Sequence, residues 1–175
     1  MSTNLRVRPD ASEYAPFYHG YVANVPEGDI VDLLRAGGRE LVEALGRIAE
    51  DRGGFRYGPE KWSIREVVGH LIDAERIFAY RALRVARGDQ TPLAAFEENS
   101  YVKTAGSDAR TMVDLTRELG AVRETTVLLF ESFPDDAWGR SGVASGKEVS
   151  LRALAYIMAG HARHHLRILR ERYAI

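Results

Sequence analysis

The chain has 175 residues, and this length predicts a single domain over residues 1–175. It carries 24 Lys and Arg against 25 Asp and Glu, and this near-neutral balance argues against a nucleic-acid partner, which usually meets a basic face. It has no cysteine, which excludes disulfides, thiolate metal ligands and a cysteine nucleophile. Any metal must therefore be held by His, Asp or Glu.

The sequence shows no sign of export or membrane insertion. Residues 1–10 are polar and lack an apolar stretch of the signal-peptide type. No run approaches the ~20 apolar residues that cross a bilayer. We therefore expect a soluble, cytoplasmic protein with no membrane partner.

Helical periodicity dominates the chain, with apolar residues recurring three and four positions apart. Four segments show it, at about residues 27–51, 63–87, 108–133 and 150–173. The first is interrupted by Gly37 and Gly38 and ends before Gly53 and Gly54. Four amphipathic helices of similar length bury their apolar faces best on one another, which predicts an all-α four-helix bundle.

Start signals support two of these helices. Ser63 and Glu66 have the spacing of a capping box, and Ser150 is placed as an N-cap. Two long connections remain. The segment 88–107 is expected to hold a short helical turn at 94–101. The other connection, 133–149, includes the one place where a strand pattern competes with helix, a few residues at 147–149.

Five histidines are the strongest chemical feature, and three of them fall within residues 161–165. His161 and His165 are four apart, which stacks them on one helix face at a spacing that lets two imidazoles chelate one ion. They continue the apolar stripe of Leu154 and Met158, so they should point into the bundle. Buried nitrogens without partners cost roughly 1–3 kcal/mol each, and a metal ion would satisfy both.

A metal site usually needs a third ligand, and His70 is the candidate. It lies at the edge of the second helix's inward stripe, so it meets the pair if the second and fourth helices are neighbours. A lone histidine on an apolar face is more often a hydrogen-bonded core residue, so position alone leaves both interpretations open. His164 lies to one side of the stripe, which predicts a place on the flank, beside the ligands or at an interface.

Other polar residues have simpler interpretations. Glu66 could orient a histidine or bind metal, but its capping position explains it better. Asp73 and Glu75 are predicted to be solvated. Tyr18 and Tyr21 could line a pocket, although tyrosines near an N-terminus more often pack over a bundle end. No side chain stands out as a general base, so the catalytic residues stay unassigned.

Two stretches resemble the DinB-like superfamily. Residues 61–75 carry a Trp-Ser start, a Glu and a His-Leu pair, similar to its second helix. Residues 149–168 carry His-x-x-His-His near their end, similar to its last helix. The resemblance implies an up-down-down-up bundle that binds one divalent metal ion per chain through His70, His161 and His165.

The resemblance also implies a function. Relatives are described as metal-dependent hydrolases or, in the YfiT-like and bacillithiol-transferase branch, as metal-dependent thiol transferases, and a mycothiol-dependent group shares the fold. We expect a hydrolase whose metal activates water on a small-molecule substrate. The alternatives are a transferase using a low-molecular-weight thiol and a non-catalytic metal-binding stress protein.

The metal and the assembly are the remaining expectations. Three imidazoles suit zinc, nickel, iron or copper. We expect zinc or nickel first, with iron or manganese next. The resemblance also implies a homodimer.

Overall fold

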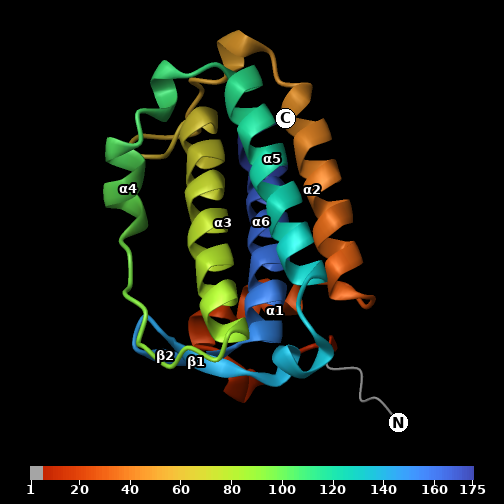
Figure 1. Cartoon of the computed structure of the whole chain (residues 1–175). Helices are drawn as coiled ribbons and strands as arrows, with labels where there is room; N and C mark the ends of the chain where they lie inside the picture. The colour runs from red at the N-terminus through yellow and green to blue at the C-terminus, as the bar shows by residue number, and fades with distance from the viewer. Residues whose placement is uncertain (1–5) are drawn as a thin grey trace.

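The structure is a computed structural model and describes residues 6–175, so half of the polar stretch 1–10 lies outside the described residues. Its four long helices are α2 (Ile30–Gly46), α3 (Ile64–Ala86), α5 (Met112–Glu131) and α6 (Leu151–Tyr173). In Figure 1, α2 runs upward, α3 and α5 run downward and α6 runs upward again. Helices α2 and α3 each pack against both α5 and α6. The all-α fold and the up-down-down-up four-helix bundle are thus confirmed.

The two helices that carry the histidine motifs begin where the sequence predicted. The Ser63 hydroxyl accepts from the Glu66 amide at 3.0 Å, and the Glu66 carboxylate accepts from the Ser63 amide at 2.8 Å. Ser150 Oγ likewise accepts from the Ala153 amide at 3.1 Å. These caps fix the first turns of α3 and α6 and so set which residues face the core.

The first helix ends earlier than predicted. Helix α2 stops at Gly46, and a separate 3-10 turn, Glu50–Arg52, follows it. The cause lies elsewhere in the fold, because the Glu50 carboxylate accepts from the backbone amide of Met112 at 2.9 Å and pairs with Arg65 at 2.5 Å. These bonds hold residue 50 at the start of α5, so the predicted helix over 27–51 was too long.

The long connections carry small elements of their own. Because α3 and α5 run in the same direction, the chain between them must return along the bundle, and α4 (Glu98–Thr104) lies on this return path beside α3 (Figure 1). It begins later than the turn predicted at 94–101 because Glu97 caps it, accepting from the amides of residues 99 and 100. A hairpin of β1 (Ser141–Ala144) and β2 (Lys147–Ser150) joins α5 to α6 and includes the strand expected at 147–149.

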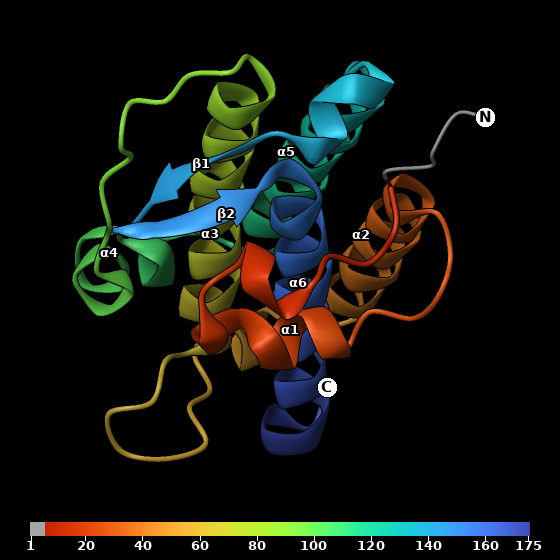
Figure 2. The same ribbon diagram turned by 90° about the horizontal axis from the view of Figure 1, so that it is seen from below.

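A close backbone contact places the short helix α1 (His19–Ala23) against α6. Gly160 of α6 lies so near the carbonyl of Tyr21 that an added Cβ would overlap it. The glycine therefore allows α1 to lie across α6, as the view from below shows (Figure 2). The buried apolar residues form two clusters, one towards each end of the bundle. In α6 the first cluster extends to Ala159 and the second begins at Ala162, so His161 lies between them.

The structure corrects the prediction for Glu75. This residue is 5% exposed and pairs with the buried Arg123 of α5 at 2.9 Å. Gly38 makes room for the arginine, since a Cβ there would overlap the Arg123 side chain. Asp73 is half-buried, so the prediction that both acids are solvated was wrong for Glu75 and only partly right for Asp73. Within residues 6–175, no helix is long and apolar enough to cross a lipid bilayer.

Candidate metal centre

Three histidines from two helices meet in the interior. His70 comes from α3, and His161 and His165 lie one turn apart on α6. The Nε2 atom of His161 is 3.0 Å from Nε2 of His70 and 3.1 Å from Nε2 of His165. One nitrogen from each ring lies within 4.8 Å of the others. Because metal–imidazole bonds are about 2.0–2.1 Å long, three nitrogens at these spacings could share one ion.

Burial keeps these rings uncharged. It lowers the pKa of His70 from 6.5 to about 4. For His161, burial and then the neighbouring His165 and His70 hold the pKa well below its usual range. Burial and the same kind of neighbours lower the pKa of His165. Neutral imidazoles offer the lone pairs that metal binding requires, and the donor set therefore fits a divalent ion.

Aromatic side chains surround the three rings. Trp62 lies 4.8 Å from His70 and Phe78 lies 6.0 Å from His161, both measured between ring centroids. Tyr21 covers His161 edge-on at 5.4 Å. These aromatic contacts hold the imidazole rings of His70 and His161 in place.

His164 stays outside the cluster, as predicted. Its ring packs on Tyr21 at 5.1 Å and on His165 at 5.2 Å, and the residue is partly exposed. It contributes no nitrogen to the group of three. Glu66 is occupied by its cap and by an ion pair with Arg56 at 2.5 Å, so its capping role is confirmed.

A cavity of about 250 Å³ opens beside His70 and His161. Three parts of the chain supply most of its wall: the segment leading into α1 with α1 itself (Phe17, Tyr18, Tyr21), α3 (Ala74, Phe78, Arg81), and the end of the connection before α4 with the first residue of α4 (Phe96, Glu97, Glu98). Tyr18 and Tyr21 thus line the pocket. The sequence had left this open beside the more common arrangement, in which such tyrosines pack over a bundle end. Burial, followed by the Glu98 carboxylate, raises the pKa of the Tyr21 phenol, which therefore keeps its proton.

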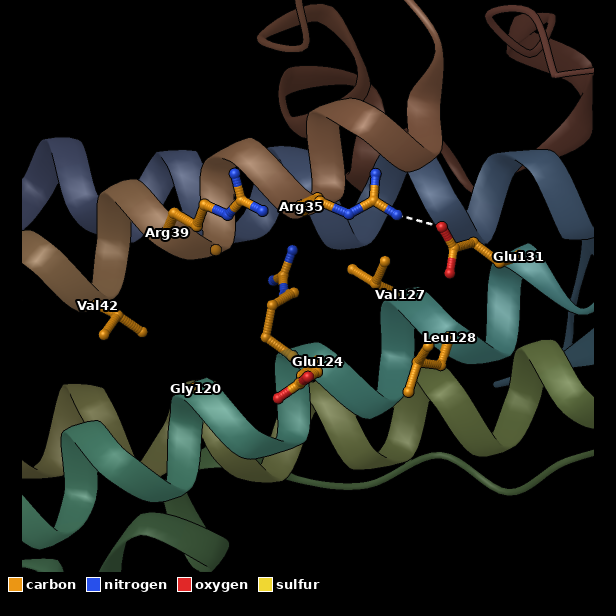
Figure 3. A pocket seen from close by; sticks show the side chains of 10 residues that line it. Arg35, Arg39, Val42, Gly120, Glu124, Val127, Leu128 and Glu131 are labelled. Atoms are coloured by element: carbon orange, nitrogen blue, oxygen red, sulfur yellow. Dashed lines mark hydrogen bonds and ion pairs between the residues drawn. The ribbon is translucent and has the colours of Figure 1, made fainter.

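Another hollow, of about 410 Å³, lies between α2 and α5. Figure 3 shows its charged lining, in which Arg35 of α2 reaches across to Glu131 of α5. The lining residues include no histidine. The three clustered histidines lie on the α3–α6 side of the bundle, away from this groove.

Sequence reasoning missed Arg81, the charged residue that α3 contributes to the cavity wall. It lies seven residues after Ala74 and eleven after His70 on α3, and both spacings return close to the same helix face. A charged residue on an otherwise apolar inward stripe was the signal that could have revealed it. Phe96 belongs to the connection before α4, where no periodicity points to a pocket.

The comparison with known families settles the relationship. A family model described as the DinB superfamily matches residues 33–169, which is most of the chain. The chain belongs to the DinB superfamily. The resemblance in the two histidine helices is therefore confirmed.

Solved structures share the fold of this DinB-superfamily protein at low sequence identity. YfiT from Bacillus subtilis, described as a probable metal-dependent hydrolase with an unusual four-helix bundle topology, matches with a TM-score of 0.74 at 16% identity, over 97% of this chain and 95% of that one. A mycothiol-dependent maleylpyruvate isomerase matches with a TM-score of 0.67 at 14% identity, over 83% and 61%. The DinB-like protein YjoA from Bacillus subtilis matches with a TM-score of 0.59 at 22% identity, over 81% and 87%. No curated protein sequence matches the chain.

Proposed function

We propose that this protein is a metal-dependent hydrolase of a small-molecule substrate, with one divalent ion held by His70, His161 and His165. The main support is the convergence of three uncharged imidazoles, with Nε2 atoms 3.0 and 3.1 Å apart, beside a cavity. An ion on three neutral ligands keeps its full charge and lowers the pKa of a water molecule that it binds. Three protein ligands also leave coordination positions open, as catalytic sites do.

Residues around the histidines have defined roles in this proposal. Trp62 packs on the ring of His70 and Phe78 on the ring of His161, and these contacts fix the orientation of both imidazoles. Tyr21 covers His161 and lines the cavity with a phenol that stays protonated, so it can donate a hydrogen bond to the substrate. The aromatic wall also binds the apolar part of a small molecule.

Thiol transfer is the second candidate. Its support is the shared fold with the mycothiol-dependent maleylpyruvate isomerase over 83% of this chain. A low-molecular-weight thiol would occupy the open side of the histidine cluster and attack an electrophile in the cavity. A non-catalytic metal-binding protein is the outcome to be expected if neither chemistry is found.

Substrate panels test the proposal. The metal-loaded protein is incubated with ester and amide panels alone, and separately with electrophiles and candidate thiols. We expect hydrolysis in the wild type and in His164→Ala, and at least a hundredfold less in His161→Ala. Turnover only with added thiol would select the transferase, and silence in both panels would favour the non-catalytic reading.

The identity of the metal and the oligomeric state are also proposals. Zinc or nickel is the proposed ion, because imidazole ligands suit these metals, with iron or manganese next. Elemental analysis of protein purified without chelator identifies the ion. The homodimer and the cytoplasmic location stay predictions, and light scattering in solution tests the first of them.

A further inference from the structure

Arg81 of α3 brings a buried positive charge to the cavity beside the histidines. The residue is 3% exposed and lines the cavity wall. Its Nη2 atom donates to the Ala94 carbonyl at 2.8 Å and to Ser145 Oγ at 3.0 Å, and both acceptors are neutral. A guanidinium has five N–H donors, and within residues 6–175 no acceptor meets those on Nε and Nη1. Three donors are therefore left for a ligand.

A second buried arginine provides the contrast. Arg123 is 6% exposed and has Glu75 as its counter-ion, with a nitrogen–oxygen distance of 2.9 Å. Buried charges are normally paired in this way, because an isolated charge is costly to remove from water. Among residues 6–175, no carboxylate lies within ion-pair distance of Arg81. The fold thus leaves the counter-ion of Arg81 to come from outside the chain.

Phe78 connects the arginine to the histidines. The Arg81 guanidinium carbon lies 5.8 Å from the Phe78 ring centroid, and that ring lies 6.0 Å from the ring of His161. A smaller hollow of about 210 Å³ adjoins the cavity, and Arg81 and Phe78 line both. A short molecule with an apolar body along Phe78 could therefore reach from the arginine to the histidine cluster.

The rim of the cavity formed by the start of α4 carries negative charge. Glu97 and Glu98, at the start of α4, also line it. Glu97 is engaged in capping α4, and neither acid is within ion-pair distance of Arg81. These carboxylates disfavour a ligand with a second anionic group at that rim. A monocarboxylate fits this distribution of charge better than a dicarboxylate or a phosphate ester.

We propose that Arg81 binds the carboxylate of the substrate, a small monocarboxylate whose apolar body lies along Phe78. Its reacting bond then lies at the histidines, so this inference rests on the function proposed above. A guanidinium suits this ligand because its charge is permanent and its free Nε and Nη1 groups can each donate a charge-assisted hydrogen bond to a carboxylate oxygen. Ser145, at the tip of the hairpin, and the Ala94 carbonyl hold the guanidinium in place through its Nη2 atom.

Binding of a model ligand to the metal-free protein tests the proposal apart from catalysis. The probe is 3-phenylpropionate, with 3-phenylpropionamide as its neutral counterpart, measured by titration calorimetry after chelator treatment. We expect the wild type to bind the carboxylate at least about tenfold more tightly than the amide. Arg81→Gln should abolish this preference. Arg84→Gln is the control and should keep the preference. Arg84 lies about one turn after Arg81 on α3, pairs with Asp89 and lines neither hollow.

Opposite results are equally clear. Equal affinity of wild type and Arg81→Gln for the carboxylate would overturn the proposal. So would binding that needs the metal and vanishes in His161→Ala, because the ion would then be the carboxylate site. If Arg81→Gln fails to fold, amide chemical shifts of the wild type decide: changes at Ala94 and Ser145 support the proposal, and changes elsewhere refute it. A carboxylate preference without any hydrolysis would preserve this inference while rejecting the proposed reaction.

Discussion

Gly160 of α6 lies directly against the carbonyl group of Tyr21, so that α1 and α6 meet backbone to backbone one residue before His161. The contact places the Tyr21 ring on His161 at 5.4 Å and on His164 at 5.1 Å. A residue without a side chain thus determines where one wall of the cavity stands. The histidine cluster and the tyrosine that covers it therefore depend on the same turn of α6.

Gly160→Ala should destabilise the protein and displace Tyr21. The added methyl group overlaps the Tyr21 carbonyl, and overpacking of this kind costs about 1–3 kcal/mol, more than the helix propensity that alanine gains. Urea unfolding gives the free energy. Gly37→Ala is the matched control: its Cβ meets open space within α2, so it should stabilise by roughly 0.5–1 kcal/mol. Equal effects at both positions would contradict the close contact.

The buried pair of Glu75 and Arg123 should respond unequally to single and double replacement. Glu75→Leu or Arg123→Met alone leaves a buried charge unpaired, at a cost of about 3–5 kcal/mol. Oε1 of Glu75 and Nε of Arg123 have no partner within the described residues, so the pair is incompletely satisfied. The double variant should therefore recover most of the loss. A double-mutant cycle measures this, and additive losses would refute it.

The metal-free protein should lose stability as the pH falls from about 6.5 towards 4. Burial lowers the pKa of His70 from 6.5 to about 4, so the unfolded chain binds the proton first in this interval. The contribution of His70 is complete above pH 6.5 and falls by about 2 kcal/mol by pH 5. Urea unfolding of chelated protein at several pH values should show a smaller slope for His70→Gln than for the wild type. A flat profile between pH 7 and 5 would be inconsistent with neutral buried histidines.

Local rules predicted much of the bundle. The three-and-four spacing located the four long helices, and the capping box at Ser63 and Glu66 fixed the start of α3. The same periodicity placed His161 and His165 inward and His164 on the flank, which the ring contacts bear out. These features were accessible because they depend on residues a few positions apart on one helix.

Features that depend on two helices were not accessible. Glu75 looked solvated because its partner Arg123 lies on α5, 48 positions along the chain. The glycine at position 38 looked like a simple interruption, yet it makes room for that same arginine. Likewise α2 ends at Gly46 because Glu50 bonds the amide of Met112. His70 joined the histidine pair only through its family resemblance, since periodicity cannot pair α3 with α6.

Metal content of single histidine variants tests the central claim most directly. Wild type and the four alanine variants at positions 70, 161, 164 and 165 are purified without chelator, and bound divalent metal is measured per chain. We predict about one ion per chain in the wild type and in His164→Ala, and a loss of most of it in the other three variants. Retention of the ion in His161→Ala, or its loss only in His164→Ala, would contradict a site built from His70, His161 and His165.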